Sequence, residues 1–348
     1  MTGKTRGKRS PTRPTMVQVA ELAEVSIFTV SAVVNGTTPV SDALRARVEA
    51  AIRQSGYRPS ALARSLRTGR THTVGLSIGD ITNPFYTDVV ARVQRDLHAA
   101  GYAVMLCCNE RDVTLQDEQI ALMRARSVDG LIVSPAGEDA RLRRALEGFG
   151  APVVLIDRVL AEFDCDTVLL DNRAAMGEAV GHLVALGHRR IGLVAGLAES
   201  FTGRERLAGY REALARAGIR QDPALVESGN FRSQEAVGAT QRLMALAEPP
   251  TALIAANNLS AIGTMKGLNG LGLVCPRDVS LAAIDDFPWA DVFEPRLTTL
   301  AQPVDAFGAE AARMLVERIT GRVQGSGRKV VLTGMLRVRS STRRIAVT

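Results

Sequence analysis

Residues 25–36, VSIFTVSAVVNG, have the pattern of a short capped helix. Ser26 can N-cap a helix over residues 27–35, and Gly36 can end it. Just upstream, MVQVAELA (residues 16–23) places small apolar residues at three-residue spacing, which predicts another helix. A link of about three residues between two short helices is typical of a helix-turn-helix. The sequence therefore predicts an all-α helix-turn-helix unit over residues 15–58.

Downstream of this pair, DALRARVEAAIRQSG (residues 42–56) predicts a third helix with a buried stripe of Leu44, Val48, Ala51 and Ile52. SALARSLRTGRT follows Pro59 and is too short and polar to form a stable helix alone. We interpret residues 59–71 as a hinge helix and linker, ordered when a partner binds. Residues 1–14, rich in Thr, Lys, Arg and Pro, are predicted to be a disordered basic tail.

The positive charge of the chain is concentrated at its N-terminal end. Residues 1–70 carry 12 Lys and Arg against 4 Asp and Glu, a net charge of +8, whereas the remainder has a net charge of −1. A basic module on a nearly neutral body is the electrostatic pattern of a protein that binds a polyanion such as DNA.

From residue 72 the sequence alternates buried strand-like runs, among them TVGLSIG, GLIVSP and VSLAAI, with helical stretches. This alternation predicts α/β architecture with parallel sheets covered by helices. About eight units divide into two groups, so we expect two Rossmann-like lobes with a ligand cleft between them. The expected lobes are residues 72–168 with 301–328, and residues 169–300 with 329–345.

Several other classes of protein are disfavoured by the sequence. No window approaches 18 consecutive apolar residues, and the N-terminus lacks the apolar region of a secretory signal. We therefore expect a cytoplasmic protein with no membrane partner. The four cysteines have no metal-ligand spacing and are predicted to be reduced. Neither a metal nor a cofactor is expected.

The chain from about residue 15 onward resembles the lactose/galactose repressor family of bacterial transcription regulators. The resemblance is carried by VAELAEVSIFTVSAVVNG, VSDALRARVEAAIRQSGYRPSALARSL, TVGLSIGDITNPFY, DGLIVSP, HLVALGHRRIGLVAG, RLAGY, PTALIAANN and PRLTTLAQP. It implies a homodimer that binds double-stranded operator DNA, most simply as a repressor. It also implies a core similar to periplasmic sugar-binding proteins, in which a small effector switches the affinity for DNA.

The sequence departs from the family pattern at a few positions. Glu24 stands in the turn where the family commonly has Gly, Ala32 where it often has Arg, and Asn258 where it has Asp. Gly suits a left-handed turn, so Glu24 is expected to cost some stability. The sequence also ends shortly after RSSTRR, without a leucine heptad for tetramer assembly.

The resemblance places Ile27, Phe28 and Ala32 at the positions that read base edges. Ala32 cannot make the bidentate hydrogen bonds of Arg to guanine, whereas Ile27 and Phe28 can contact thymine methyl groups. An alternative is that Phe28 packs inside the small domain. Contacts to phosphates, which position without specifying, are expected from the polar residues of this helix, Ser26, Thr29, Ser31 and Asn35.

The hinge supplies a second means of recognition. Leu66, with Ala63 beside it, matches the leucine that family members insert into the minor groove. Such a wedge kinks DNA and favours a flexible central step.

In the core, the family's effector pocket maps onto eight residues: Phe85, Tyr86, Asp157, Thr202, Arg206, Phe231, Asn257 and Asp285. Aromatic faces with Arg and Asp suit a polyhydroxylated ligand, a sugar or sugar derivative. We expect Arg206 and Asp285 to act as a pair. The nearby Arg158, Arg204 and Arg232 leave a sugar acid or sugar phosphate open.

Two alternative functions fit parts of the sequence. GLSIG (residues 75–79) fits the G-x-S-x-G nucleophile elbow of α/β-hydrolases, but its alternating pattern predicts a strand running through Ser77. We therefore predict that the protein is not an enzyme. A periplasmic transport protein would fit the core but not the basic N-terminal module.

Overall fold

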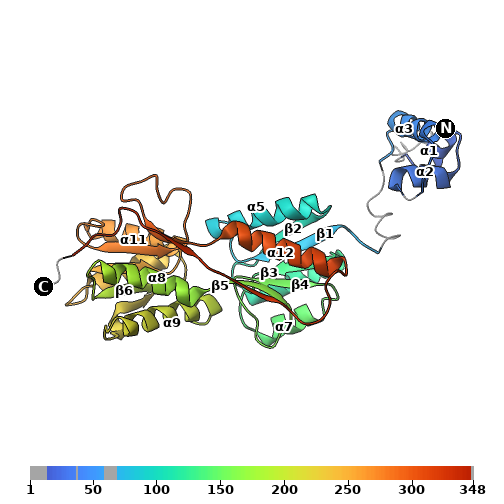
Figure 1. The fold of residues 1–348 in the computed structure, drawn as a ribbon. Helices are drawn as coiled ribbons and strands as arrows, with labels where there is room; N and C mark the ends of the chain where they lie inside the picture. The colour runs from blue at the N-terminus through green and yellow to red at the C-terminus, as the bar shows by residue number, and fades with distance from the viewer. Residues whose placement is uncertain (1–13, 37, 59–68, 346–348) are drawn as a thin grey trace, which may run out of the picture. The chain divides into compact units, whose positions relative to one another are not determined.

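The computed structural model describes residues 14–36, 38–58 and 69–345, which belong to two compact units, residues 1–71 and residues 72–348 (Figure 1). Ala63 and Leu66, together with most of the predicted tail and hinge, lie outside the described residues.

The first unit consists of α1 (Met16–Ala23), α2 (Ile27–Asn35) and α3 (Asp42–Ser55). Thr15 and Gln18 form a capping box at the start of α1, and the Ser26 hydroxyl accepts from the Thr29 amide at the start of α2. Val19, Val30 and Val48, one from each helix, are fully buried in the shared core. The predicted helix-turn-helix is present, and Glu24 in its turn has the expected left-handed backbone, with φ 47°.

The second unit contains two six-stranded sheets. The order of the first is β11-β5-β4-β3-β1-β2, with every pair parallel. The order of the second is β12-β10-β9-β8-β6-β7, in which only β12 runs antiparallel, against β10. The strands are β1 (Thr73–Ile78), β2 (Ala103–Cys108), β3 (Gly130–Val133), β4 (Val153–Ile156), β5 (Asp166–Leu170), β6 (Ile191–Ala195), β7 (Val226–Ser228), β8 (Ala252–Ala255), β9 (Ser280–Ile284), β10 (Thr298–Ala301), β11 (Lys329–Leu332) and β12 (Met335–Arg337).

Helices cover both faces of each sheet and so define two lobes. In lobe one, α5 and α12 pack together on one face, while α6 and α7 pack on the other. In lobe two, α8 packs with α9 and α10 packs with α11. The helices are α5 (Pro84–Ala99), α6 (Val113–Ala125), α7 (Ala140–Glu147), α8 (Asn172–Ala185), α9 (Phe201–Arg216), α10 (Ser233–Met244), α11 (Asn258–Gly270) and α12 (Val304–Ile319).

The boundaries between the lobes differ from the prediction at the C-terminal end. Residues 329–332 were assigned to lobe two, but β11 pairs with β5 and belongs to the sheet of lobe one. The sequence from 329 to 337 reads as one continuous strand, whereas the chain leaves lobe one after β11 and enters lobe two with β12. The division therefore falls between Leu332 and Met335. Residues 169–170 likewise complete β5 in lobe one, and Ala301 completes β10 in lobe two.

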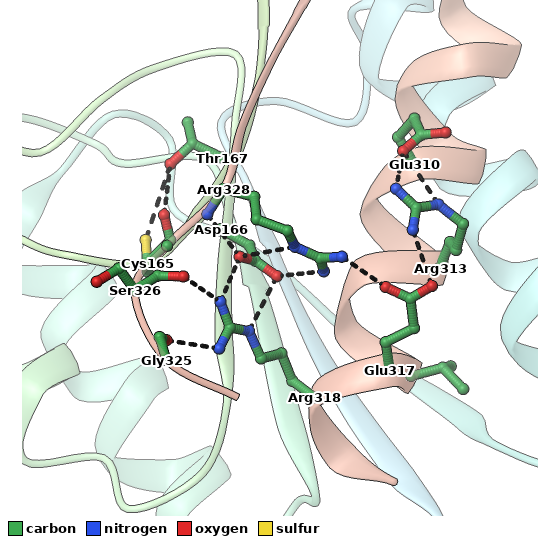
Figure 2. A network of polar contacts seen from close by, with 12 residues as sticks. Cys165, Asp166, Thr167, Glu310, Arg313, Glu317, Arg318, Gly325, Ser326 and Arg328 are labelled. Carbon is green, nitrogen blue, oxygen red and sulfur yellow. Dashed lines mark hydrogen bonds and ion pairs between the residues drawn. The ribbon is translucent and has the colours of Figure 1, made fainter. Parts of the chain in front are cut away.

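A buried carboxylate fastens three parts of lobe one together (Figure 2). Asp166, at the start of β5, has a fully buried side chain and accepts from Arg318 of α12 at 2.8 Å. It also pairs with Arg328, just before β11, at 2.7 Å. Arg328 continues the network to Glu317 of α12, also at 2.7 Å. These two guanidinium groups hold the pKa of Asp166 well below its ordinary value.

Within the described residues, no single helix is long and apolar enough to cross a membrane. The bent pair α1 and α2 meets the criteria of length and composition only, with an angle of 107° between the helices. Their apolar faces pack in the core of the first unit.

Candidate DNA-contacting helix and ligand-binding cleft

The exposed side of α2 carries apolar side chains that its own core does not use. Phe28 is 71% exposed and Ile27 is 49% exposed, so both remain available to a partner. The alternative that Phe28 packs inside the small domain is wrong. Ala32, in contrast, is only 3% exposed, although it is not a member of the core cluster that the three helices share. Its contact with the bases therefore stays a prediction.

The polar residues of α2 are partly engaged within the helix. Ser26 and Thr29 share a hydrogen bond between their hydroxyl groups at 2.9 Å. Asn35 donates to the Ser31 carbonyl at 2.7 Å and to its hydroxyl at 3.2 Å. Polar side chains of these types can contact phosphates, and the N-terminal end of α2 favours anions through the helix dipole.

In the second unit, the cleft forms where strands end. Asp157 follows β4, Asn257 follows β8 and Asp285 follows β9. In open α/β sheets, ligands bind outside the carboxyl ends of parallel strands. All eight residues predicted for the effector site line one pocket there, together with four others, Asn83, Arg111, Arg158 and Gln302.

Lobe one presents an aromatic pair and a carboxylate. Asn83 caps α5 by accepting from the Phe85 amide at 3.0 Å, which fixes Phe85 and Tyr86 at the start of the helix. The Tyr86 hydroxyl donates to Asp157 at 2.8 Å and therefore accepts from the Ser134 hydroxyl, also at 2.8 Å. Burial, with the charge of Asp157, raises the pKa of Tyr86, so this hydroxyl keeps its proton.

Lobe two presents Arg206 and Asp285. Arg206 of α9 donates to the Asn172 side chain at 2.8 Å and to the Ala256 carbonyl. Asp285 accepts from Gln302 at 2.5 Å. The predicted pair thus lines one pocket, but each member hydrogen bonds to another residue. Burial raises the pKa of Asp285, and the nearby charge of Arg206 opposes that rise.

Backbone strain gathers at this pocket. Asp157, Phe231 and Asp285 all have left-handed backbones, with φ of 66°, 57° and 72°. Side-chain-bearing residues rarely adopt this conformation, and such strain tends to cluster at ligand sites. Each of the three side chains is almost fully buried and lines the pocket.

Some lining residues were not in the predicted set. Gln302 follows β10, a strand that we did not predict, and Asn83 acts as a helix cap. Arg158 was named only as a neighbour; it is buried, donates to the Pro135 carbonyl at 3.1 Å and lies 3.6 Å from Asp157. The signal that could have found it is its position directly after a strand-end aspartate.

Ser77 is not a nucleophile elbow. It lies within β1, as its alternating pattern predicted, and is fully buried. Its hydroxyl accepts from Gln116 at 2.9 Å, which places it in a structural polar network.

A helix-turn-helix unit in one chain with a polar cleft lined by both lobes of an α/β core defines a DNA-binding transcription regulator that carries a small-molecule-binding core. Residues 15–60 match the bacterial regulatory proteins of the lacI family, and residues 180–342 match a periplasmic binding protein-like domain. The chain belongs to the lacI family of bacterial transcription regulators. It is 36% identical over 309 residues to the ribose operon repressor of Escherichia coli (strain K12), which covers 88% of this chain and 93% of that protein.

Solved structures agree over most of the chain. The lac repressor dimer bound to operator and the anti-inducer ONPF has a TM-score of 0.86 at 27% identity, covering 95% of this chain and 100% of that one. A complex of the transcriptional regulator CelR with cellobiose has a TM-score of 0.73 at 34% identity, covering 94% and 100%. A lacI family regulator from Enterococcus faecium with bound ribose has a TM-score of 0.72 at 27% identity, covering 79% and 100%.

Proposed function

We propose that this regulator is a homodimeric repressor that binds operator DNA through α2, and that a single-ring sugar, a pentose such as ribose, sets its affinity for DNA from the cleft. The observation that carries the proposal is the composition of the pocket. Asp157 and Asp285 offer acceptors to hydroxyl groups, and Arg206 offers donors, while Phe85 and Phe231 offer apolar faces. This combination suits a sugar ring.

The comparisons with relatives bear on the size of the sugar. Relatives bind sugars of both sizes, cellobiose in one structure and ribose in another. The 36% identity to a ribose operon repressor supports the choice of a single, ribose-like ring.

The pocket also supports a second ligand class. Three guanidinium groups, those of Arg111, Arg158 and Arg206, line it against two carboxylates. The surplus positive charge would suit a sugar acid, so ligands of this class belong in the same screen.

On the DNA side, we propose that Ile27 and Phe28 contact bases and that Ser26, Thr29, Ser31 and Asn35 contact phosphates. We also propose that Leu66, with Ala63 beside it, inserts into the minor groove. We further propose that the protein has no catalytic role, since Ser77 is locked in a strand, and that it acts in the cytoplasm, where bacterial DNA lies.

Calorimetry with D-ribose, D-glucose and D-gluconate tests the ligand. Ribose should bind, and Arg206→Ala should weaken it at least tenfold, because charged hydrogen bonds contribute about 1.5–3 kcal/mol each. The matched control is Arg211→Ala, an exposed residue on the same helix, which should leave the affinity unchanged. Binding of none of these ligands, or equal affinity in both variants, would exclude the proposed pocket chemistry.

A further inference from the structure

Two strained loops, one from each lobe, meet at the mouth of the cleft. Glu110 and Arg111 follow β2 in lobe one, with φ of 51° and 64°. Asn230 and Phe231 follow β7 in lobe two, with φ of 48° and 57°. Each left-handed residue costs free energy and persists only where the surroundings hold it. Two consecutive strained residues on each side therefore require an interaction that fixes them.

That interaction is made by the Arg111 side chain. Its Nη1 donates to the Asn230 carbonyl at 2.7 Å, and its Nη2 donates to the Phe231 carbonyl at 3.2 Å. The guanidinium carbon also lies 5.8 Å from the centroid of the Phe231 ring. Arg111 thus crosses from lobe one to lobe two and holds the loop that carries an aromatic wall of the pocket.

The same side chain separates two spaces. Arg111 lines the pocket, and it also lines an outer cavity of about 280 Å³ formed by residues 79–82, Cys108, Glu110 and Arg232. It is the one residue common to the two linings. A ligand group that extends from the pocket toward this outer cavity must therefore displace the guanidinium from two carbonyls.

We propose that Arg111 is a specificity-determining residue that closes the mouth of the cleft and excludes ligands with a substituent directed toward the outer cavity. The identity of the excluded ligands rests on the proposed function, in which the pocket holds a ribose-like ring. The separation of the pocket from the outer cavity rests only on the contacts of Arg111.

The ligand arm of the test uses D-ribose and the four riboses singly O-methylated at C1, C2, C3 or C5. Wild-type protein should prefer ribose to every one of them. In Arg111→Ala, the preference over at least one methyl derivative should shrink at least tenfold, because the outer cavity becomes reachable. Arg111→Lys keeps a cation but loses the paired hydrogen bonds, and should give an intermediate preference.

The matched control is Arg204→Ala. Arg204 of lobe two also bridges the lobes, through a 2.6 Å ion pair with Glu138, but it lines neither cavity. Loss of this ion pair should weaken the binding of all five sugars by a similar factor. The preference for ribose over its methyl derivatives should stay unchanged. The same preference in Arg111→Ala and Arg204→Ala would overturn the assignment of Arg111 to specificity.

A second arm needs no ligand. Amide hydrogen exchange in the peptide containing residues 229–233 should become at least tenfold faster in Arg111→Ala and remain unchanged in Arg204→Ala. Unchanged exchange in Arg111→Ala would show that Arg111 does not hold this loop, and would overturn the proposal. If wild-type protein binds none of the five sugars, the proposed ribose-like ligand is wrong, and the exchange comparison still decides the role of Arg111.

Discussion

At the scale of single residues, Glu24 is a strained position that a substitution can relieve. Its left-handed backbone costs a side-chain-bearing residue roughly 1 kcal/mol. Its ion pair with Arg47, 3.2 Å long and largely exposed, returns little of this. Glycine relieves this strain, but it also raises the conformational entropy of the unfolded chain, which offsets part of the gain in stability. Glu24→Gly should therefore stabilise the first unit by about 0.5 kcal/mol, measured as slower amide exchange in α1 to α3 of the full-length chain.

The control for this prediction is Glu24→Ala, which loses the ion pair but keeps the Cβ atom. It should give no gain in stability. Faster exchange in Glu24→Gly than in the wild type would contradict the strain argument and give the Arg47 pair the larger role.

Asp285 should make ligand affinity depend on pH. Because burial raises its pKa, Asp285 takes up a proton at a higher pH than an exposed carboxyl group does. Hydroxyl groups of a sugar donate to the ionised form, so affinity should fall as pH is lowered through this raised pKa. The stability of the unliganded protein changes in the opposite direction. It should rise as pH is lowered, because the folded state binds the proton of Asp285 more tightly than the unfolded chain does.

Calorimetry with ribose in a series of buffers from neutral to acidic pH measures this effect. Asp285→Asn should bind more weakly at neutral pH and show a flatter profile. An equally steep profile in that variant would assign the titration to another group.

At the scale of elements, the Asp166 network joins β5, α12 and the segment before β11. Asp166→Asn would leave two partly buried guanidinium groups without their carboxylate, which typically costs about 3 kcal/mol or more. Urea unfolding at neutral pH should show this loss. Glu310→Gln, at the outer end of the same network (Figure 2), should cost well under 1 kcal/mol because Glu310 and its partner Arg313 are partly exposed.

The pH dependence of this network has a definite sign. The folded-state pKa of Asp166 is depressed, so its stabilisation is present above the unfolded pKa and is lost as pH falls toward the folded value. The stability difference between wild type and Asp166→Asn should therefore shrink on acidification. A difference that stays constant would mean that the carboxylate charge is not its source.

The recognition helix α2 should read thymine methyl groups through Ile27 and Phe28. Replacing a contacted thymine by uracil deletes one methyl group and keeps the base pairing. Burial of a methyl-sized group contributes about 0.8 kcal/mol, so each uracil should weaken operator binding roughly fourfold. In Phe28→Ala, uracil at the position contacted by Phe28 should no longer matter. If uracil changes nothing in the wild type, the helix holds DNA mainly by its phosphates.

The elements were largely predictable because their signals are local. The caps of α2 and the buried runs of the parallel strands lie within short windows of sequence. β10 was missed because Thr298 and Thr299 look polar, yet both are fully buried and hydrogen bonded by side chains distant in sequence. β11 was misassigned because its pairing with β5 spans more than half of the second unit.

Asp157 and Asp285 were predicted from the resemblance to the family, and each directly follows a strand that the sequence predicts. Arg111 could not be found in this way, because its role depends on a lobe that is distant in sequence. The exposure of Phe28 could not be decided from the sequence, because an aromatic side chain at that position can lie in the core of the small domain or on its surface.

At the scale of the whole molecule, the positive charge is concentrated in the first unit. We therefore expect the first unit to bind DNA and the second to bind the sugar. The net charge of +8 lies within residues 1–70, whereas the rest of the chain has a net charge of −1. A fragment of residues 72–348 should bind ribose with the affinity of the DNA-free full-length protein and should not bind operator. In the full-length protein, log K for operator should fall with log salt by about 0.9 per neutralised phosphate.

Coupling between the two units adds a stricter test. If ribose changes operator affinity by some factor, operator must change ribose affinity by the same factor, because the two effects share one coupling free energy. We expect a factor of at least five, measured by ribose titrations of the full-length protein with and without saturating operator. Arg206→Ala should weaken ribose binding in both states while operator binding without ribose survives. Equal ribose affinity in the two states would mean that the cleft binds sugar without controlling DNA, and that the switch lies elsewhere in the chain.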